Sequence, residues 1–333
     1  MLAAHGTIDA RLAVPMGTTI TATGDLALGD AYANDGFYSD GILEVGVHTV
    51  TLKDANQAVL GSVTTLGGGS GGSIVAANGL LVEFGKNVNG FGSIDTPNDP
   101  LTPTINNGDL VGNSLAEPIT LSGYVKGVGT FDNVAFTGTF APGFSPATVY
   151  LGSAQYAGSL EIELSGLTEG DSDLLHHSGD LVLGGVLDVS LWGGFVPMPG
   201  SAIDIMTYAG NLSGAFTGIT NSTGYAGLIL GYTTDADSVM VTTGYLAGDL
   251  NLDGFVGIED LNTVLSVWNQ YVPAGDIFQG DPSGDGFVGI EDLNVVLGNW
   301  NAGTPPGESS NIPEPANAAV LLTLLLFARK QSR

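Results

Sequence analysis

A ten-residue segment, DGFVGIEDLN, occurs twice, at 253–262 and at 285–294. Another aspartate stands four residues before each copy, so oxygen-bearing side chains recur at positions 1, 3, 5 and 12 of a twelve-residue loop. These side chains are Asp249, Asn251, Asp253 and Asp260 in the first loop, and Asp281, Ser283, Asp285 and Asp292 in the second. Ca²⁺ prefers six to eight oxygen ligands at about 2.3–2.6 Å, and this spacing wraps them around one ion. The sequence therefore predicts two Ca²⁺ sites.

The remaining loop positions fit the same ion. Gly254 and Gly286 stand at position 6, where a calcium loop turns sharply. Phe255 and Phe287 stand at position 7, which contributes a main-chain carbonyl oxygen. Position 12 is aspartate in both copies, whereas the general EF-hand pattern has a bidentate glutamate there. The shorter side chain predicts a longer contact with Ca²⁺ or a better tolerance of Mg²⁺.

A short helix is expected after each loop. Apolar residues recur there at i, i+3, i+4 and i+7, which is the spacing of one helix face. They are Leu261, Val264, Leu265 and Trp268 in the first copy, and Leu293, Val296, Leu297 and Trp300 in the second. We expect the two stripes to bury each other in a pseudo-twofold pair. A unit of about 60 residues has little core of its own, so metal binding should contribute much of its folding free energy.

A duplicated loop–helix unit without an entering helix resembles the type I dockerin module, here over residues 244–304. Aspartate at position 12 is also a dockerin feature. The resemblance implies docking to a cohesin-like protein domain through loop positions 10 and 11, which are Ile258, Glu259, Ile290 and Glu291. These are not the Ser/Thr pairs common in cellulosomal dockerins, and neither helix carries Lys or Arg. A structural role, or docking within the chain, is therefore an equal alternative.

Acidic residues strongly outnumber basic ones. The 333-residue chain has 34 Asp plus Glu against 7 Lys plus Arg, a formal net charge of −27. Nucleic acid and anionic lipid are bound through Lys and Arg that neutralise phosphates, so the composition argues against both. The same charge should attract divalent cations. Cysteine is absent from the sequence, which excludes disulfides and thiolate metal sites.

Most of the chain has the pattern of β-strands. From 6 to about 243, short apolar or β-branched runs are separated by Gly, Asn and Asp, as in SLEIELSG at 159–166. A parallel β-solenoid and a sandwich or barrel both fit, and weak echoes such as GDLALGD and GDLVLGG favour the solenoid. A segment rich in Pro and Asn at 95–109 is the candidate boundary between solenoid repeats at 1–95 and a second β-domain at 110–243.

Part of this region resembles a known repeat. The segments GTFAPGFSPATVYLGSAQY (138–156) and LGGVLDVSLWGGFVPMPGSAIDIMTYAGNLSGAFTGI (183–219) are similar to the autotransporter-type β-repeat of large secreted bacterial surface proteins. The resemblance covers 123–243 and implies solenoid scaffolding, while it says little about activity. The overall expectation is a mostly β chain, a parallel β-solenoid with autotransporter-like repeats. A small α-helical, EF-hand-like dockerin module and a short C-terminal hydrophobic helix should follow it.

The C-terminus carries three successive signals. After a linker at 305–311 come Pro313, Glu314 and Pro315, then an apolar run and a basic end. The segment 312–333 resembles the PEP-CTERM sorting signal, which implies an exosortase-type processing enzyme and a transient membrane anchor. A helix of about 13 residues spans about 20 Å against a hydrocarbon core of about 30 Å. Such an anchor needs local thinning of the bilayer or snorkelling side chains.

These resemblances predict a protein that is extracellular or on the cell surface. Export requires an N-terminal signal peptide. The first residues have neither a charged n-region nor an apolar h-region, so the chain does not begin with one. We therefore expect that its start is truncated or misassigned.

Catalytic signatures are weak. Glu161 and Glu163 share one strand face, about 6.6 Å apart by strand rise, a separation close to that of glycosidase pairs, but a solvated face explains them more simply. We expect His176 and His177 at a turn or on the surface. The sequence thus favours a non-catalytic surface protein whose calcium module docks a partner or stiffens a stalk. The alternative is a carbohydrate-active enzyme or glycan-binding protein delivered by its dockerin.

Overall fold

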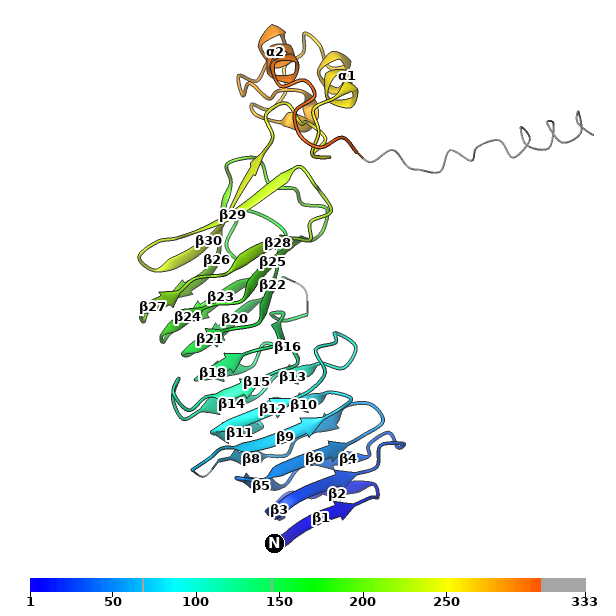
Figure 1. Ribbon diagram of the computed structural model, residues 1–333, viewed down its shortest axis with the longest axis vertical. Coiled ribbons are helices and arrows are strands. Elements are labelled where there is room, and N and C mark those ends of the chain that lie inside the picture. The colour runs from blue at the N-terminus through cyan, green and yellow to red at the C-terminus, as the bar shows by residue number, and fades with distance from the viewer. Residues whose placement is uncertain (68, 145, 307–333) are drawn as a thin grey trace, which may run out of the picture.

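Stacked turns of parallel strands make up most of the molecule (Figure 1). The computed structural model describes residues 1–67, 69–144 and 146–306. Within these residues the chain forms a parallel β-solenoid of about 8 turns and two α-helices. The predicted solenoid is confirmed, and the sandwich or barrel is not the architecture.

Two sheets run along the solenoid. The large sheet consists of β1 (Leu2–Ile8), β3 (Thr19–Gly29), β5 (Ile42–Gly46), β6 (Thr49–Lys53), β8 (Val63–Leu66), β9 (Gly72–Ala76), β11 (Asn87–Gly90), β12 (Gly92–Asp95), β14 (Asp109–Gly112), β15 (Ile119–Leu121), β17 (Thr130–Asp132), β18 (Val134–Phe136), β20 (Thr148–Leu151), β21 (Ala154–Tyr156), β23 (Leu174–His177), β24 (Leu181–Leu183), β26 (Ala202–Tyr208), β27 (Leu212–Gly214), β29 (Leu228–Thr234) and β30 (Ser238–Tyr245). The small sheet consists of β2 (Leu12–Val14), β4 (Phe37–Ser39), β7 (Ala58–Val59), β10 (Leu80–Val82), β13 (Thr104–Asn106), β16 (Tyr124–Lys126), β19 (Thr139–Phe140), β22 (Ser159–Leu164), β25 (Val186–Leu191) and β28 (Gly218–Asn221).

A typical turn supplies two strands to the large sheet and one to the small sheet. For example, β20, β21 and β22 form one turn, and β23, β24 and β25 form the next. Equivalent strands of the two turns pair in parallel. The pairing places Glu161 of β22 beside Asp188 of β25. Outward-facing side chains of neighbouring turns are therefore aligned in rows across the surface.

The alternation of burial explains why these segments are strands. In β22, Leu160, Ile162 and Leu164 are fully buried, whereas Glu161 and Glu163 between them are partly exposed. A strand projects successive side chains to opposite faces, so one face reaches the core and the other reaches water. The same pattern recurs from turn to turn and builds one continuous core along the solenoid.

The Pro- and Asn-rich segment at 95–109 lies inside this stack. β11 pairs with β14, and β12 pairs with β15, so both pairings bridge the segment. The large sheet therefore continues from the first predicted β-region into the second.

A close approach between turns requires glycine at Gly185, before β25. Its φ is +59°, in the left-handed region. A Cβ there would lie 1.7 Å from the carbonyl oxygen of Gly158 in the preceding turn. The glycine therefore permits the spacing at which β22 and β25 pair.

An aromatic stack with a buried histidine fills the middle of the core. The ring centroid of Phe136 lies 4.2 Å from that of Phe140 and 5.3 Å from that of Tyr156. The Tyr156 hydroxyl lies 3.1 Å from Nε2 of His177, whose Nδ1 lies 3.4 Å from the Gly152 carbonyl oxygen. Because a carbonyl only accepts, we assign the proton to Nδ1, and Nε2 accepts from Tyr156. His177 is a core residue of β23, so its expected place at a turn or on the surface is wrong.

The solenoid ends in a change of strand direction. β30 pairs antiparallel with β26 and with β29. Beyond this hairpin lie α1 (Ile258–Ser266), a 3₁₀ turn (Ile277–Gln279) and α2 (Ile290–Gly298). We call residues 246–304 the tip module, because Figure 1 shows them at the end of the stack. Both helices follow the repeated loops, as the sequence predicts.

The buried ring of His177 should make stability depend on pH. Burial lowers the pKa of His177 to about 4, from an ordinary value of 6.5. Between pH 6.5 and pH 4, His177 is protonated in the unfolded chain but stays neutral in the folded chain. Its contribution to the free energy of unfolding is therefore fully present above pH 6.5 and falls as the pH decreases toward 4. We expect the difference in free energy of unfolding between the wild type and His177→Gln to shrink by about 3 kcal/mol over this range.

Denaturant unfolding at pH 7.5 and pH 4, followed by circular dichroism, measures this difference. Subtraction of the variant removes the effect of every other titrating group. A difference that is equal at the two pH values would contradict the assignment.

Candidate metal centre

The first predicted calcium loop is folded around its own aspartates. Asp249 accepts hydrogen bonds from the backbone N–H groups of Asp253 and Gly254, at 3.1 and 2.9 Å. Asp260 accepts from Gly257 at 2.7 Å and lies in the first turn of α1. Gly254 has a φ of +89°, which the sharp turn at position 6 requires. The predicted first and last ligands of the loop are thus held in place by its backbone.

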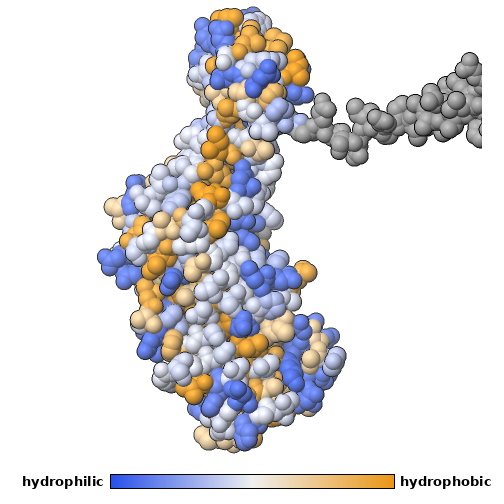
Figure 2. Space-filling view, in the orientation of Figure 1, coloured by the Kyte–Doolittle hydropathy of each residue, from blue (hydrophilic) through white to orange (hydrophobic). Residues whose placement is uncertain are grey.

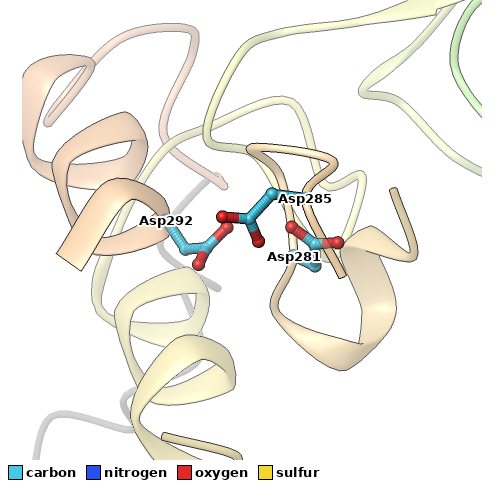
Figure 3. A group of neighbouring side chains, drawn as sticks. All are labelled: Asp281, Asp285 and Asp292. Carbon is cyan, nitrogen blue, oxygen red and sulfur yellow. The ribbon is translucent and has the colours of Figure 1, made fainter. Parts of the chain in front are cut away.

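The second loop repeats these bonds and brings its carboxylates together. Backbone N–H groups at positions 6, 7 and 9 donate to the carboxylates at positions 1, 5 and 12, at 2.8, 2.8 and 2.7 Å. One oxygen of each of Asp281, Asp285 and Asp292 lies within 4.8 Å of the others (Figure 3). Two oxygens that both contact Ca²⁺ are at most about 5.2 Å apart. The spacing therefore fits one ion.

The first loop is less convergent. Among the residues that the structure describes, its three aspartates do not form such a group. Asn251 Nδ2 donates to Asp253 Oδ2 at 3.0 Å, so two predicted ligands bind each other. In the second loop, Ser283 at the equivalent position donates instead to Asp281, at 3.0 Å. The side chain at position 3 thus donates to the position-5 carboxylate in the first loop and to the position-1 carboxylate in the second.

Each loop is tied to the segment that follows the opposite helix. Phe255 forms an antiparallel bridge with Gly303, after α2, and Phe287 forms one with Tyr271, after α1. The bridges hold the backbone of both predicted position-7 residues. They also relate the two halves of the tip module as a pseudo-twofold pair.

The segment that carries both loops contains no positively charged side chain to balance these carboxylates. Asp249, Asp260, Asp281 and Asp292 are at most 1% exposed. Residues 244–304 contain no Lys, Arg or His. Burial raises the pKa of Asp249 to about 6, and the negative charge of Asp260 adds to the rise. Because a buried carboxylate without a partner is costly, the donor set fits a hard divalent cation such as Ca²⁺.

Apolar patches lie among hydrophilic residues on the solvent-exposed surface of the tip module (Figure 2). Val264 and Val296 are buried, as predicted, but the other ends of both stripes are not. The exposed fractions lie between 39% and 50% for Leu265, Trp268, Leu297 and Trp300. The expected mutual burial of the complete stripes is therefore wrong. Each helix has nine residues, and Val264 and Val296 lie in one buried cluster with residues of both loops and of the end of the solenoid.

The predicted partner-binding residues lie on the surface. Ile258 and Ile290 are each 53% exposed, and Glu259 and Glu291 are exposed beside them. All four stand in the first turn of α1 or α2. They are therefore available to a second protein.

The inner face of the module packs against the end of the solenoid. Leu252, at position 4 of the first loop, is buried in one core with Leu228 of β29. Its φ of 58° is unusual and costly for leucine. Gly227 donates to the Leu252 carbonyl at 2.8 Å, and a Cβ at Gly227 would lie 2.1 Å from Asp249 Oδ2. Sequence reasoning missed both residues, because no local pattern marks a contact between segments this far apart.

The remaining predicted site residues are not part of the candidate metal centre. Glu161 and Glu163 lie on the outer face of the small sheet, far along the chain from either loop. Most of the predicted linker and the whole segment 312–333, including Pro313, Glu314 and Pro315, lie outside the described residues. In the part of the chain that the structure describes, no helix is long and apolar enough to cross a membrane.

Comparison with known proteins adds no relative. No family model, no curated protein and no solved structure matches this chain. The dockerin, autotransporter-repeat and PEP-CTERM resemblances therefore stay predictions from the sequence.

The metal centre predicts a binding stoichiometry. Calorimetric titration of the full chain with Ca²⁺ should give two ions, and Asp253→Ala or Asp285→Ala should each remove one, because each loses a ligand from one loop. Asp237→Ala, an exposed acidic residue before β30, is the matched control. Two ions bound by either loop variant would contradict the predicted ligands.

The contact at Gly227 predicts a change in calcium binding from outside the loops. Gly227→Ala places a methyl group against Asp249, so the first site should lose at least about tenfold in affinity while the second keeps its own. Gly218→Ala is the control, since a Cβ there meets nothing within 4 Å. The two binding steps are read from the same calorimetric titration. Equal loss at both sites would contradict a specific contact with the first loop.

Proposed function

We propose that this chain is a non-catalytic, secreted or cell-surface β-solenoid whose calcium-bound tip module docks a partner protein. The observation that carries the proposal is the apolar face left open on both helices of the module. Exposed apolar side chains that gather on one face of a soluble domain mark an interaction site. Here they stand beside two loops that are suited to Ca²⁺.

The proposed module is a type I dockerin. Two loops with aspartate at position 12, each followed by a short helix, support this assignment. The partner it implies is a cohesin-like protein domain. Ile258 and Ile290 would supply apolar anchors to that partner, and Trp268 and Trp300 would extend the contact, because aromatic and aliphatic anchors carry most of the energy of an interface.

The repeat gives the partner two equivalent ways to bind. α1 and α2 begin with the same five residues, IEDLN, and Ile258 and Ile290 have equal exposure. A partner that recognises one helix can therefore recognise the other after a rotation of about half a turn. Loss of one face alone would leave the second available.

The same module would also stiffen the solenoid. Its inner face shares a core with Leu228 of β29, and the first loop rests on Gly227. Calcium that orders the loops would therefore also order the cover on the last turns of the solenoid. Docking and stabilisation use opposite faces of the module, so one does not exclude the other.

The surface location rests on the C-terminal sequence. Pro313, Glu314 and Pro315, followed by an apolar run and a basic end, support sorting by an exosortase-type enzyme and a transient membrane anchor. Export would bring the module to a compartment where Ca²⁺ is abundant. The large negative charge supports a role without nucleic acid.

Binding to a panel of cohesin domains, measured by biolayer interferometry on the full chain with Ca²⁺ or with EDTA, tests the docking role. Binding should require Ca²⁺. Ile258→Lys or Ile290→Lys alone should weaken it only a few-fold, whereas the double variant should weaken it at least about a hundredfold. Leu101→Lys, an exposed leucine on the solenoid, is the control. Binding that survives EDTA or the double variant would exclude the proposed face.

A further inference from the structure

A hollow of about 400 Å³ lies on the outer face of the small sheet. It spans β16, β22 and β25, and neither calcium loop contributes to it. Side chains of three kinds line it: carboxylates, aromatic rings and small residues. Ligand sites in proteins typically combine a concave surface of this size with a few placed polar groups.

The register of the solenoid produces the hollow. Glu161 stands beside Asp188, and Glu163 stands beside Ser190, in adjacent outward positions of β22 and β25. The small side chains of Ser190 and Ala141 leave the space between the longer side chains unfilled. The hollow therefore depends on which outward-facing residues occupy neighbouring positions of successive turns.

Two aromatic rings stand at its rim. Phe144, in the loop after β19, is 57% exposed, and Trp192, which follows β25, is 48% exposed. The backbone N–H of Trp192 donates to the Leu164 carbonyl at 2.8 Å, so the end of the neighbouring strand holds the main chain at Trp192. Exposed aromatic rings beside a polar hollow offer flat apolar surfaces to a ligand.

One buried acceptor in the hollow has no hydrogen-bond donor. Oδ1 of Asp188 is buried and has no hydrogen-bond partner among the described residues. The Tyr124 hydroxyl already donates to Glu161. Asp173 accepts from the backbone N–H groups of Ala147 and Glu163 and is thereby fully engaged. A buried acceptor without a donor is costly, so the arrangement favours a ligand that donates to Asp188.

The charges of the hollow argue against acidic ligands. Lys126 is the one cationic side chain that lines the hollow, against four carboxylates. A phosphate, sulfate or uronate would be repelled. Within the described part of the chain, these carboxylates do not form a group close enough to hold a metal. A ligand rich in hydroxyl donors, with apolar faces for the two rings, satisfies every observation.

We propose that this hollow binds a non-acidic oligosaccharide. Trp192 and Phe144 pack on the faces of its pyranose rings, while Asp188 and Glu161 accept hydrogen bonds from its hydroxyl or amino groups. The site belongs to the solenoid and does not depend on the docking function of the tip module. The protein would thus hold a glycan along its length and a partner protein at its end.

Titration of the full chain in Ca²⁺ with three hexasaccharides, followed by calorimetry, tests the site. Cellohexaose or the glucosamine hexamer of chitosan should bind, and which of them binds better distinguishes a neutral ligand from an amino sugar. Hexagalacturonate should not bind, because its carboxylates meet those of the hollow. Trp192→Ala and Asp188→Asn should each lower the affinity at least about tenfold.

Variants that keep the fold complete the test. Trp192→Phe retains a ring and should retain most of the affinity, so a general loss of structure at this position is distinguished from a lost stacking surface. Phe84→Ala removes an exposed ring elsewhere on the solenoid and should change nothing. Absence of binding to both non-acidic sugars, equal binding of hexagalacturonate, or unchanged binding by Trp192→Ala overturns the proposal.

Discussion

Each turn of a parallel solenoid packs against the next, so its last turn needs a cover. In this chain the cover begins with β30, which pairs antiparallel with β26, and with β29, which pairs antiparallel with β30. The tip module completes it through a core that includes Leu228 from the solenoid side and Leu252 from the loop side. The position of the calcium loops, and the direction in which the helices face, both follow from this contact.

The second constraint is electrostatic. Four buried aspartates lie in a module without a single cationic side chain, and burial raises the pKa of Asp249 to about 6. In the proposed calcium-bound state, a divalent cation would balance these carboxylates and supply folding free energy at the same time. Because Gly227 leaves space only for the backbone beside Asp249, binding of an ion in the first loop would be linked to packing at the end of the solenoid. The proposed metal site and a structural contact would thus be combined in one place.

The rows of outward-facing side chains on the solenoid form a surface hollow that is separate from the tip module. Pairing of equivalent strands repeats the inward positions faithfully, but it leaves the outward positions free to vary. Glu161, Asp188 and Ser190 lie side by side only because two turns are stacked in register. Their neighbours Ala141 and Trp192 decide that the surface there is hollow and has an aromatic rim. The hollow is therefore formed by residues of several turns, and no single strand contains all of them.

The sequence by itself determined the elements and the ligand order of the loops, since both depend on near neighbours. Alternation in SLEIEL specified a strand, and the spacing from Asp281 to Asp292 specified a loop that closes on itself. Tertiary structure alone decided that Trp268 stays in water, that His177 enters the core and that Gly227 touches Asp249. Each of these depends on which distant segment occupies the adjoining space. The periodicity of one segment predicts which face of a strand or helix a residue occupies. It does not predict which distant segment packs against that face.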